Sequence, residues 1–312
     1  IRLTGDNGNL SWTLGAYMFE EDSFGSIDVP VLRGYTPPSA ADWPMYYLVI
    51  PGVLNVAQTV MGTQMFGSRS QSNDVTNSNE AFYAEGTYAF NDQTDLTIGM
   101  RRTEDEREYL RIQSLIGGGF DPAYACPGNI DATTGVAKSD RCYQEIDYSE
   151  TTSRAILSHA YNEDLLVYAS YSKGYSSGGF NQDVRMKPFL PEVSDNYEVG
   201  FKSTLRDGTV RLNATYFSTI YKNQQITVGR VIDGQPTADI INAAEADLSG
   251  LEVELAAQLT DNLALTMTYG LLDGEYNDFN VIDTLYDPAT FVSTDVLRDL
   301  TSTPFGGSGD NG

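Results

Sequence analysis

The 312-residue sequence predicts an all-β protein, an antiparallel transmembrane β-barrel with long extracellular loops. Apolar residues recur at every second position along much of the chain, which is the period of a strand with one apolar face. The connections between these segments alternate between very short and long, as in outer-membrane barrels. Many of the 20 tyrosines and 13 phenylalanines lie near segment ends, where membrane barrels carry aromatic girdles.

The alternation predicts about nine to ten strands. It is clearest in residues 263–271, where Leu, Met and Tyr occupy the odd positions and Ala, Thr and Gly the even ones. Residues 251–259 show the same pattern, with Glu252 and Glu254 on the polar side. The other predicted strands, in chain order, are 10–18, 82–90, 96–100, 148–161, 165–171, 197–201 and 210–216.

The short connections fix the pairing of neighbouring strands. Asp207-Gly208 is a turn dipeptide favoured in two-residue hairpins. That turn pairs Leu205 with Val210, Phe201 with Ala214 and Val199 with Tyr216, so apolar residues share one face. Three-residue turns at 162–164 and 260–262 likewise place Tyr161 opposite Leu165 and Leu259 opposite Leu263. The fourth short connection is 91–94, and the long loops are 21–75, 113–146, 176–192, 227–238 and 280 onward.

Composition excludes several classes of protein. The chain has 19 Lys and Arg against 43 Asp and Glu, a formal charge of −24, which disfavours nucleic acid as a partner. One histidine and two cysteines leave no ligand set for zinc, and no metal or cofactor is expected. No stretch reaches the roughly 18 apolar residues of a membrane helix. A soluble two-layer β protein remains the alternative, which the aromatic strand ends and long loops disfavour.

The two ends of the sequence suggest a fragment. The chain opens IRLTGDNGNLSW, without an initiator Met or an export signal, and the start is expected to be internal. It closes TSTPFGGSGDNG, which is typical of an interrupted loop.

Five segments resemble the barrel of TonB-dependent outer-membrane receptors. They are LSWTLGAYMFEED (10–22), NEAFYAEGTYAFNDQTDLTIGMRRTEDERE (79–108), LLVYASYSKGYSSGGFN (165–181), PEVSDNYEVGFKSTLRDGTVRLNATYFSTIYKNQQI (191–226) and INAAEADLSGLEVELAAQLTDNLALTMTYGLLDGEYNDF (241–279). The resemblance implies a barrel of twenty-two strands with an N-terminal plug inside it. Residues 1–312 would be a partial barrel domain, because no segment of this sequence resembles the plug, the TonB box or the terminal strands.

The resemblance also implies a function and partners. It implies a receptor in a Gram-negative outer membrane, in contact with its lipid, which imports a scarce nutrient, most often a ferric siderophore. Energy would come from the TonB-ExbB-ExbD system through the plug, and no enzymatic chemistry is expected. A passive porin-type barrel and a secreted carbohydrate-active protein remain alternatives.

Aromatic and polar residues in two predicted loops are candidates for a ligand site at the extracellular mouth. Long loops in compact proteins are commonly functional, although these side chains would equally serve to pack the loops. The candidates are Trp43, Tyr46, Tyr47, Tyr175, Phe180, Asn181 and Arg185.

Charged residues on the polar side of the strands predict a hydrophilic barrel lumen. Glu252 and Glu254 would serve as an acid and base in a glycosidase, but no other catalytic group accompanies them, and a lumenal position is the simpler interpretation. Glu85 and Arg101 are predicted to form a lumenal ion pair across the 91–94 turn. Lys202 is the fifth residue predicted to face the lumen.

The two cysteines, Cys126 and Cys142, lie in the predicted loop 113–146. An exported protein passes through an oxidising compartment, so the pair is predicted to form a disulfide that closes this loop. Two free thiols, as in a cytosolic protein, are the alternative.

Overall fold

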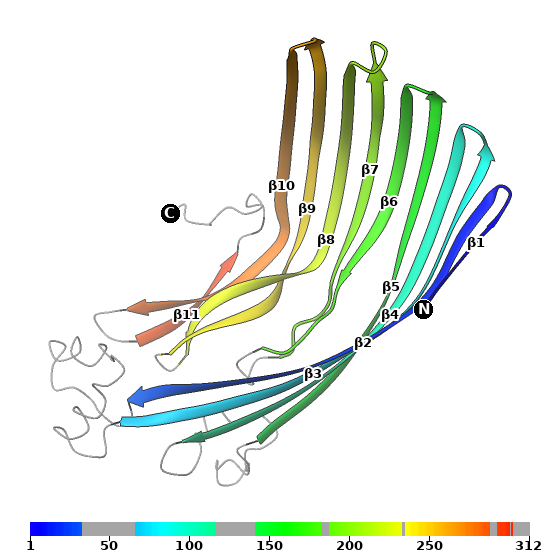
Figure 1. The fold of residues 1–312 in the computed structure, drawn as a ribbon. Coiled ribbons are helices and arrows are strands. Elements are labelled where there is room, and N and C mark those ends of the chain that lie inside the picture. Colours follow the sequence, from blue (N-terminus) through cyan, green and yellow to red (C-terminus); the bar gives the residue numbers. More distant parts are fainter. Residues whose placement is uncertain are drawn as a thin grey trace. The chain divides into compact units, whose positions relative to one another are not determined.

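The computed structural model describes residues 1–32, 66–115, 141–181, 187–232, 235–287, 292–299 and 301. Eleven strands within these ranges form one antiparallel sheet in which each strand pairs with its neighbour in the sequence (Figure 1). The predicted all-β, antiparallel fold is confirmed. The strands are β1 (Arg2–Asn7), β2 (Leu10–Leu32), β3 (Phe66–Asn91), β4 (Thr94–Leu115), β5 (Arg141–Asn162), β6 (Leu165–Ser176), β7 (Glu192–Leu205), β8 (Val210–Ile232), β9 (Gln235–Thr260), β10 (Leu263–Asp287) and β11 (Val292–Asp299).

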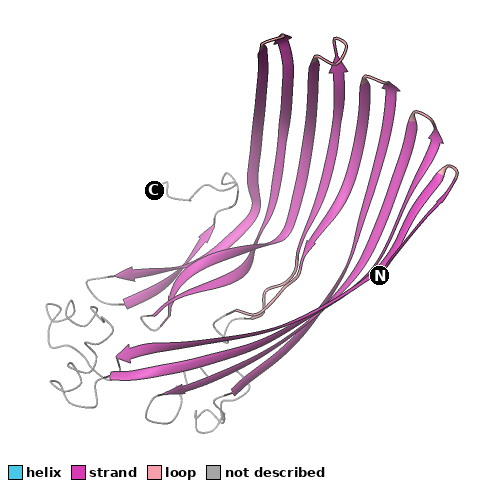
Figure 2. Cartoon of the chain, in the orientation of Figure 1, coloured by secondary structure: helices cyan, strands magenta, loops and turns pink. Residues whose placement is uncertain are grey.

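Figure 2 draws strands and loops only over the described ranges. Within them, no helix is long and apolar enough to cross a membrane. The chain divides into two compact units, which are described separately below. The first comprises Ile1–Glu20, Ser78–Glu106 and Ile146–Gly312, and the second comprises Glu21–Asn77 and Arg107–Glu145.

In the first unit, strands β7 to β10 have one apolar face and one polar face. The register aligns Val199 with Tyr216, and Leu255 with Met267, so that side chains of one kind lie side by side across the sheet. The apolar face is exposed: Val199, Tyr216, Met267, Tyr269 and Leu271 each keep between 47% and 57% of their surface accessible. Exposed apolar surface on this scale requires an apolar partner.

The register predicted from the Asp207-Gly208 turn is confirmed. Leu205 pairs with Val210 and Phe201 with Ala214, and Asp207 and Gly208 adopt positive φ values of 53° and 87°. The single pair predicted beside each of the other two turns was wrong, although pairing further along each hairpin keeps the register that a three-residue turn would give. Asn162 pairs with Leu165, and Thr260 pairs with Leu263, because the turns have two residues and are followed by a bulge at Tyr161 and at Leu259.

Four of the five predicted long loops were too long, because strands extend beyond their predicted ends. The loop predicted over 176–192 agrees with the end of β6 at Ser176 and the start of β7 at Glu192. β2 runs to Leu32, β4 to Leu115 and β10 to Asp287. In these extensions polar residues occupy both faces, as in TEDERE (103–108), so the hydrophobic alternation that marks a strand is lost. β1 and β11 were not predicted either, although Asn7-Gly8 between β1 and β2 is a hairpin signal.

Candidate functional site

The polar face of the first unit contains a cavity of about 640 Å³ beside the turn between β5 and β6. Charged groups from β7, β8 and β9 line it, and they include Lys202, Arg211, Glu252 and Glu254. Three of these residues are predicted lumenal residues, so the structure brings Lys202 together with the two glutamates. The glutamates lie in an open, solvent-exposed cavity.

Hydrogen bonds fix several side chains of this cavity. The Lys202 ammonium lies 6.0 Å from the centre of the Tyr168 ring, and the Tyr168 hydroxyl is 2.8 Å from that of Thr215. The Asn213 amide donates to Glu254 at 3.3 Å. The cavity therefore presents both charges and amide groups at defined positions, which suits a polar protein surface better than a small apolar ligand.

A second cavity, of about 320 Å³, contains Glu85 and Arg101, but these two residues do not pair as predicted. Glu85 forms an ion pair with Arg154 of β5. Arg154 reaches it over Gly99 of β4, where a Cβ atom would lie 3.2 Å from the Arg154 side chain. Arg101 instead donates to Thr103 at 3.0 Å and lies over the ring of Tyr17.

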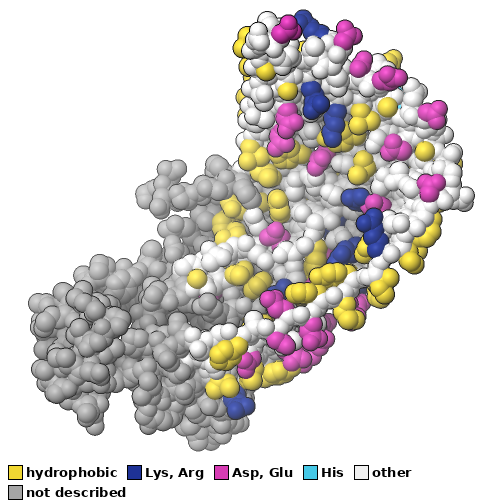
Figure 3. Space-filling model, viewed as in Figure 1, with side chains coloured by type: hydrophobic (Ala, Val, Ile, Leu, Met, Phe, Trp, Pro, Cys, Tyr) yellow, Lys and Arg dark blue, Asp and Glu magenta, His cyan; other side chains and the backbone are white. Residues whose placement is uncertain are grey.

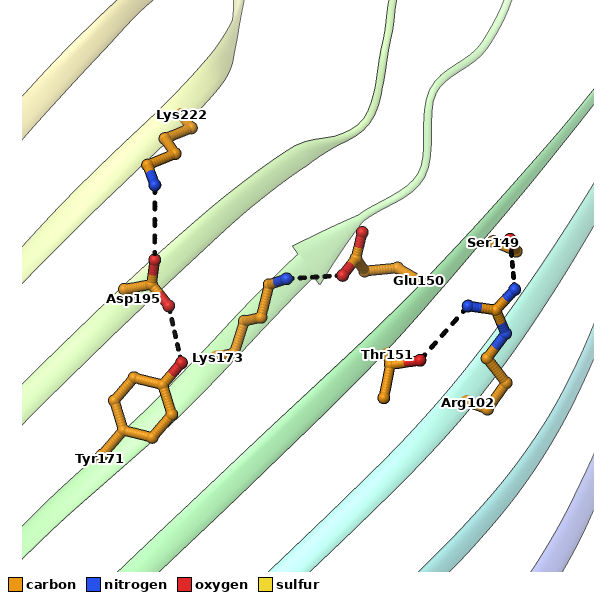
Figure 4. Close-up of polar contacts among 8 residues, drawn as sticks. All are labelled: Arg102, Ser149, Glu150, Thr151, Tyr171, Lys173, Asp195 and Lys222. Carbon is orange, nitrogen blue, oxygen red and sulfur yellow. Dashed lines mark hydrogen bonds and ion pairs between the residues drawn. The ribbon is translucent and has the colours of Figure 1, made fainter.

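Figure 3 shows side chains of both charges on the face of the sheet turned to the viewer. Separate polar contacts join neighbouring strands from β4 to β8 (Figure 4). In the order of the strands, Arg102 donates to Ser149 and Thr151, Lys173 pairs with Glu150, Tyr171 donates to Asp195, and Lys222 lies 4.0 Å from Asp195.

Two of the candidate ligand residues are engaged within the protein. The Tyr175 hydroxyl donates to Asp105 at 2.7 Å, and Asp105 also accepts a 2.6 Å bond from the Asn79 amide. Asp105 is 8% exposed, so its carboxylate holds three strands together in a buried position. Asn181 is buried and is bonded to Ile240. Phe180, which precedes it, is half-buried.

We expect Asp105→Ala to destabilise the protein by about 1–3 kcal/mol, because the Asn79 and Tyr175 donors would lose a buried acceptor. Urea unfolding of the full-length protein in lipid vesicles measures this change. Replacement of the exposed Asp273 by Ala is the control, with an expected change within about 0.5 kcal/mol. Equal effects of the two changes would contradict the role given to Asp105.

The second unit has a polar cluster of its own, which the sequence analysis missed. Arg111 donates to Gln71 at 2.7 Å, and the Gln71 amide and the Tyr109 hydroxyl donate to Asn73 at 3.2 and 2.9 Å. Arg111, Tyr109 and Gln71 are 3%, 6% and 7% exposed. Burial raises the pKa of Tyr109, and the Arg111 charge offsets part of that rise. The Tyr109 phenol is therefore neutral and remains a donor at physiological pH.

Several predicted residues lie outside the described residues: Trp43, Tyr46, Tyr47, Cys126 and Arg185. Cys142 is described, is 4% exposed and is disulfide-bonded. Among the described residues, no group of three or more His, Cys, Asp or Glu could hold a metal ion.

These features define the class of protein: a β-barrel wall of consecutively paired antiparallel strands, with one apolar and one charged face. The family model described as "TonB dependent receptor-like, beta-barrel" matches residues 2–304. The chain belongs to this family.

Curated relatives agree with this assignment. The chain is 27% identical over 178 residues to the pesticin receptor of Yersinia enterocolitica, which covers 56% of this chain and 23% of that receptor. It is 29% identical over 135 residues to the ferric-pyoverdine M114 receptor PbuA of Pseudomonas sp. (strain M114), and the match covers 41% of this chain and 16% of that receptor. The ferrioxamine B receptor of Salmonella typhimurium is 22% identical over 173 residues, covering 55% and 22%. The chain thus spans less than a quarter of the length of these relatives.

Solved structures confirm the fold. The ferric yersiniabactin uptake receptor FyuA from Yersinia pestis superposes with a TM-score of 0.57 at 17% identity, covering 88% of this chain and 34% of that one. The siderophore receptor PiuA from Acinetobacter baumannii gives a TM-score of 0.56 at 17% identity, covering 94% and 39%.

Proposed function

We propose that this chain is part of the barrel of a receptor in a Gram-negative outer membrane that takes up ferric siderophores. The observation that carries the proposal is the family match over residues 2–304 together with relatives named as receptors for ferric pyoverdine and ferrioxamine B. The exposed apolar face of β7 to β10 supports the membrane location, because lipid chains would cover it. Residues 1–312 would form one incomplete barrel domain, with uptake driven by TonB-ExbB-ExbD.

The 640 Å³ cavity supports a second part of the proposal. Its charged groups, among them Lys202, Arg211, Glu252 and Glu254, suit contact with a polar protein surface inside the barrel. In the full-length receptor that surface would be the plug. This interpretation accounts for the two glutamates without any catalytic chemistry.

Ligand recognition is assigned to the extracellular mouth. We propose that Phe180 contacts the ligand, with Trp43, Tyr46, Tyr47 and Arg185 as further candidates. Tyr175 and Asn181 would contribute indirectly, by holding neighbouring residues in place, since both side chains are already hydrogen-bonded within the protein.

Uptake of radioactive iron tests the function. We expect cells that express the full-length protein as their sole siderophore receptor to import ⁵⁵Fe from ferric ferrioxamine B or ferric pyoverdine, and to lose this import when TonB is deleted. Purified protein should bind the same complex with measurable quenching of its tryptophan fluorescence. Import that persists without TonB would favour a passive porin, and absence of binding to both complexes would overturn the substrate class.

We further propose that the disulfide of Cys142 is formed with Cys126. For a ring of this size the bond would stabilise the protein by about 3 kcal/mol. Mass spectrometry of exported protein should show both thiols protected from alkylation until reduction, and a peptide that contains both cysteines after digestion. Alkylation of Cys126 without reduction would contradict the pairing.

A further inference from the structure

The connection between β6 and β7 lies beside an open strand edge. The register pairs β7 with β8 only as far as Lys222, whereas β8 continues to Ile232 and pairs there with β9. Beyond Lys222, β8 therefore has the β6–β7 connection as its neighbour in place of a strand. We refer to residues 177–181 and 187–191 of this connection as the stem.

The stem is paired within itself and held against β5. Gly179 and Phe189 exchange two backbone hydrogen bonds of 3.0 and 2.9 Å. The Tyr148 hydroxyl of β5 donates to the Phe189 carbonyl at 3.0 Å. Gly178 allows this contact, because a Cβ atom there would collide with the Phe189 carbonyl and the Tyr148 ring.

Asn181 joins the stem to β9. Its side-chain oxygen accepts a 2.7 Å bond from the Ile240 N–H, and its amide donates to the Ile240 carbonyl at 2.9 Å and to the Lys187 carbonyl at 3.1 Å. The side chain thus satisfies both backbone groups of one β9 residue, as a neighbouring strand would. Asn181 is 6% exposed, so water does not compete effectively for these bonds.

Two further amides, from β8 and β9, complete the attachment. Gln225 donates to the carbonyls of Ser177 and Leu190 at 3.0 and 3.1 Å, which joins both sides of the stem. Asn242 accepts from the Leu190 N–H at 2.6 Å and donates to the Leu190 carbonyl at 2.8 Å. Hydrogen bonds therefore join both parts of the stem, 177–181 and 187–191, to the strands β5, β8 and β9.

We propose that Asn181, Gln225 and Asn242 are positioning residues that hold the stem rigidly, and that this rigidity places Phe180 for ligand binding. Phe180 lies between Gly179, which is paired with Phe189, and the buried Asn181. An aromatic ring that is fixed before binding loses little conformational entropy when a ligand contacts it, which strengthens binding. The role of Phe180 rests on the proposed function, whereas the rigidity of the stem does not.

A double-mutant cycle tests the positioning role in the full-length protein, with ferric ferrioxamine B and ferric pyoverdine as probes. We expect Phe180→Ala and Asn181→Ala each to weaken binding about 10-fold, and the double variant to show little further loss. Asn196→Ala is the matched control: its amide is bonded to Glu198 and Thr219, away from the stem, and affinity should be unchanged. Additive losses of about 100-fold, or normal affinity in Asn181→Ala, would overturn the positioning role.

Hydrogen–deuterium exchange keeps this inference separate from the proposed function. We expect peptides from 177–181 and from 187–191 to be protected in the wild type, equally with and without ligand, and to exchange at least 10-fold faster in Asn181→Ala and in Asn242→Ala. If the wild type binds neither ferric complex, the proposed function fails, and protection of the stem alone decides whether the three amides hold it. Rapid exchange of the wild-type stem would overturn the inference.

Discussion

Met267→Arg is expected to destabilise the intact barrel by about 2–4 kcal/mol, the cost of a cation on the lipid face near the middle of the bilayer. Met267 lies on the exposed apolar face, with Leu255 as its cross-strand partner and Leu265 and Tyr269 on either side. Denaturant unfolding of the full-length protein in lipid vesicles measures the change.

The neighbouring residue supplies the control. Thr266 precedes Met267 on the same strand and points to the opposite face. Thr266→Arg should therefore cost much less, because that face is polar. If both changes destabilise the barrel equally, both faces are packed inside protein, and the apolar face does not contact lipid.

Gly250→Ala is the second change with a large expected effect, a loss of about 1–3 kcal/mol from overpacking. Gly250 is buried in β9, and an added Cβ atom would lie 2.6 Å from the Leu271 carbonyl and 2.6 Å from the Phe217 ring. The carbonyl belongs to the paired strand β10, so the backbone would have to shift.

Gly270, on the paired strand, provides a matched comparison. A Cβ atom at Gly270 would have no neighbour within 4 Å. Gly270→Ala should therefore leave stability unchanged or raise it slightly, since alanine restricts the unfolded chain. A similar loss in both variants, measured by the same unfolding assay, would contradict the role given to close packing at Gly250.

Much of the fold could be predicted because a strand with one apolar face can pair with its neighbour only in a register that places apolar residues on the same face. Asp207-Gly208 fixed the hairpin of β7 and β8, and every predicted pair in it was confirmed. In the parts of the strands that lack apolar alternation this pattern is absent, and β2 and β4 were therefore predicted to be shorter than they are. There, backbone pairing continues without hydrophobic alternation.

The candidate site was less predictable, because its contacts cross several strands. Glu85 was expected to pair with Arg101 of the adjacent strand, but Gly99 leaves room for Arg154 from one strand further away. Asn181 is a polar residue of a type that often binds ligands, yet in the structure its side chain is hydrogen-bonded to Ile240, 59 residues later in the sequence. Neither contact follows from local sequence spacing.

The bulges beside the turns of the β5–β6 and β9–β10 hairpins have a consequence for how the length of these turns can change. At Tyr161 and Leu259 the bulge absorbs one residue before regular pairing starts, so side chains beyond it keep the facing that a three-residue turn would give. Deletion of a single residue at these turns can thus be accommodated by loss of the bulge. The pairing of β7 with β8 contains no bulge between Val193 and Leu205, so deletion of one residue at its turn would bring the apolar residues of one strand to the polar face of the other.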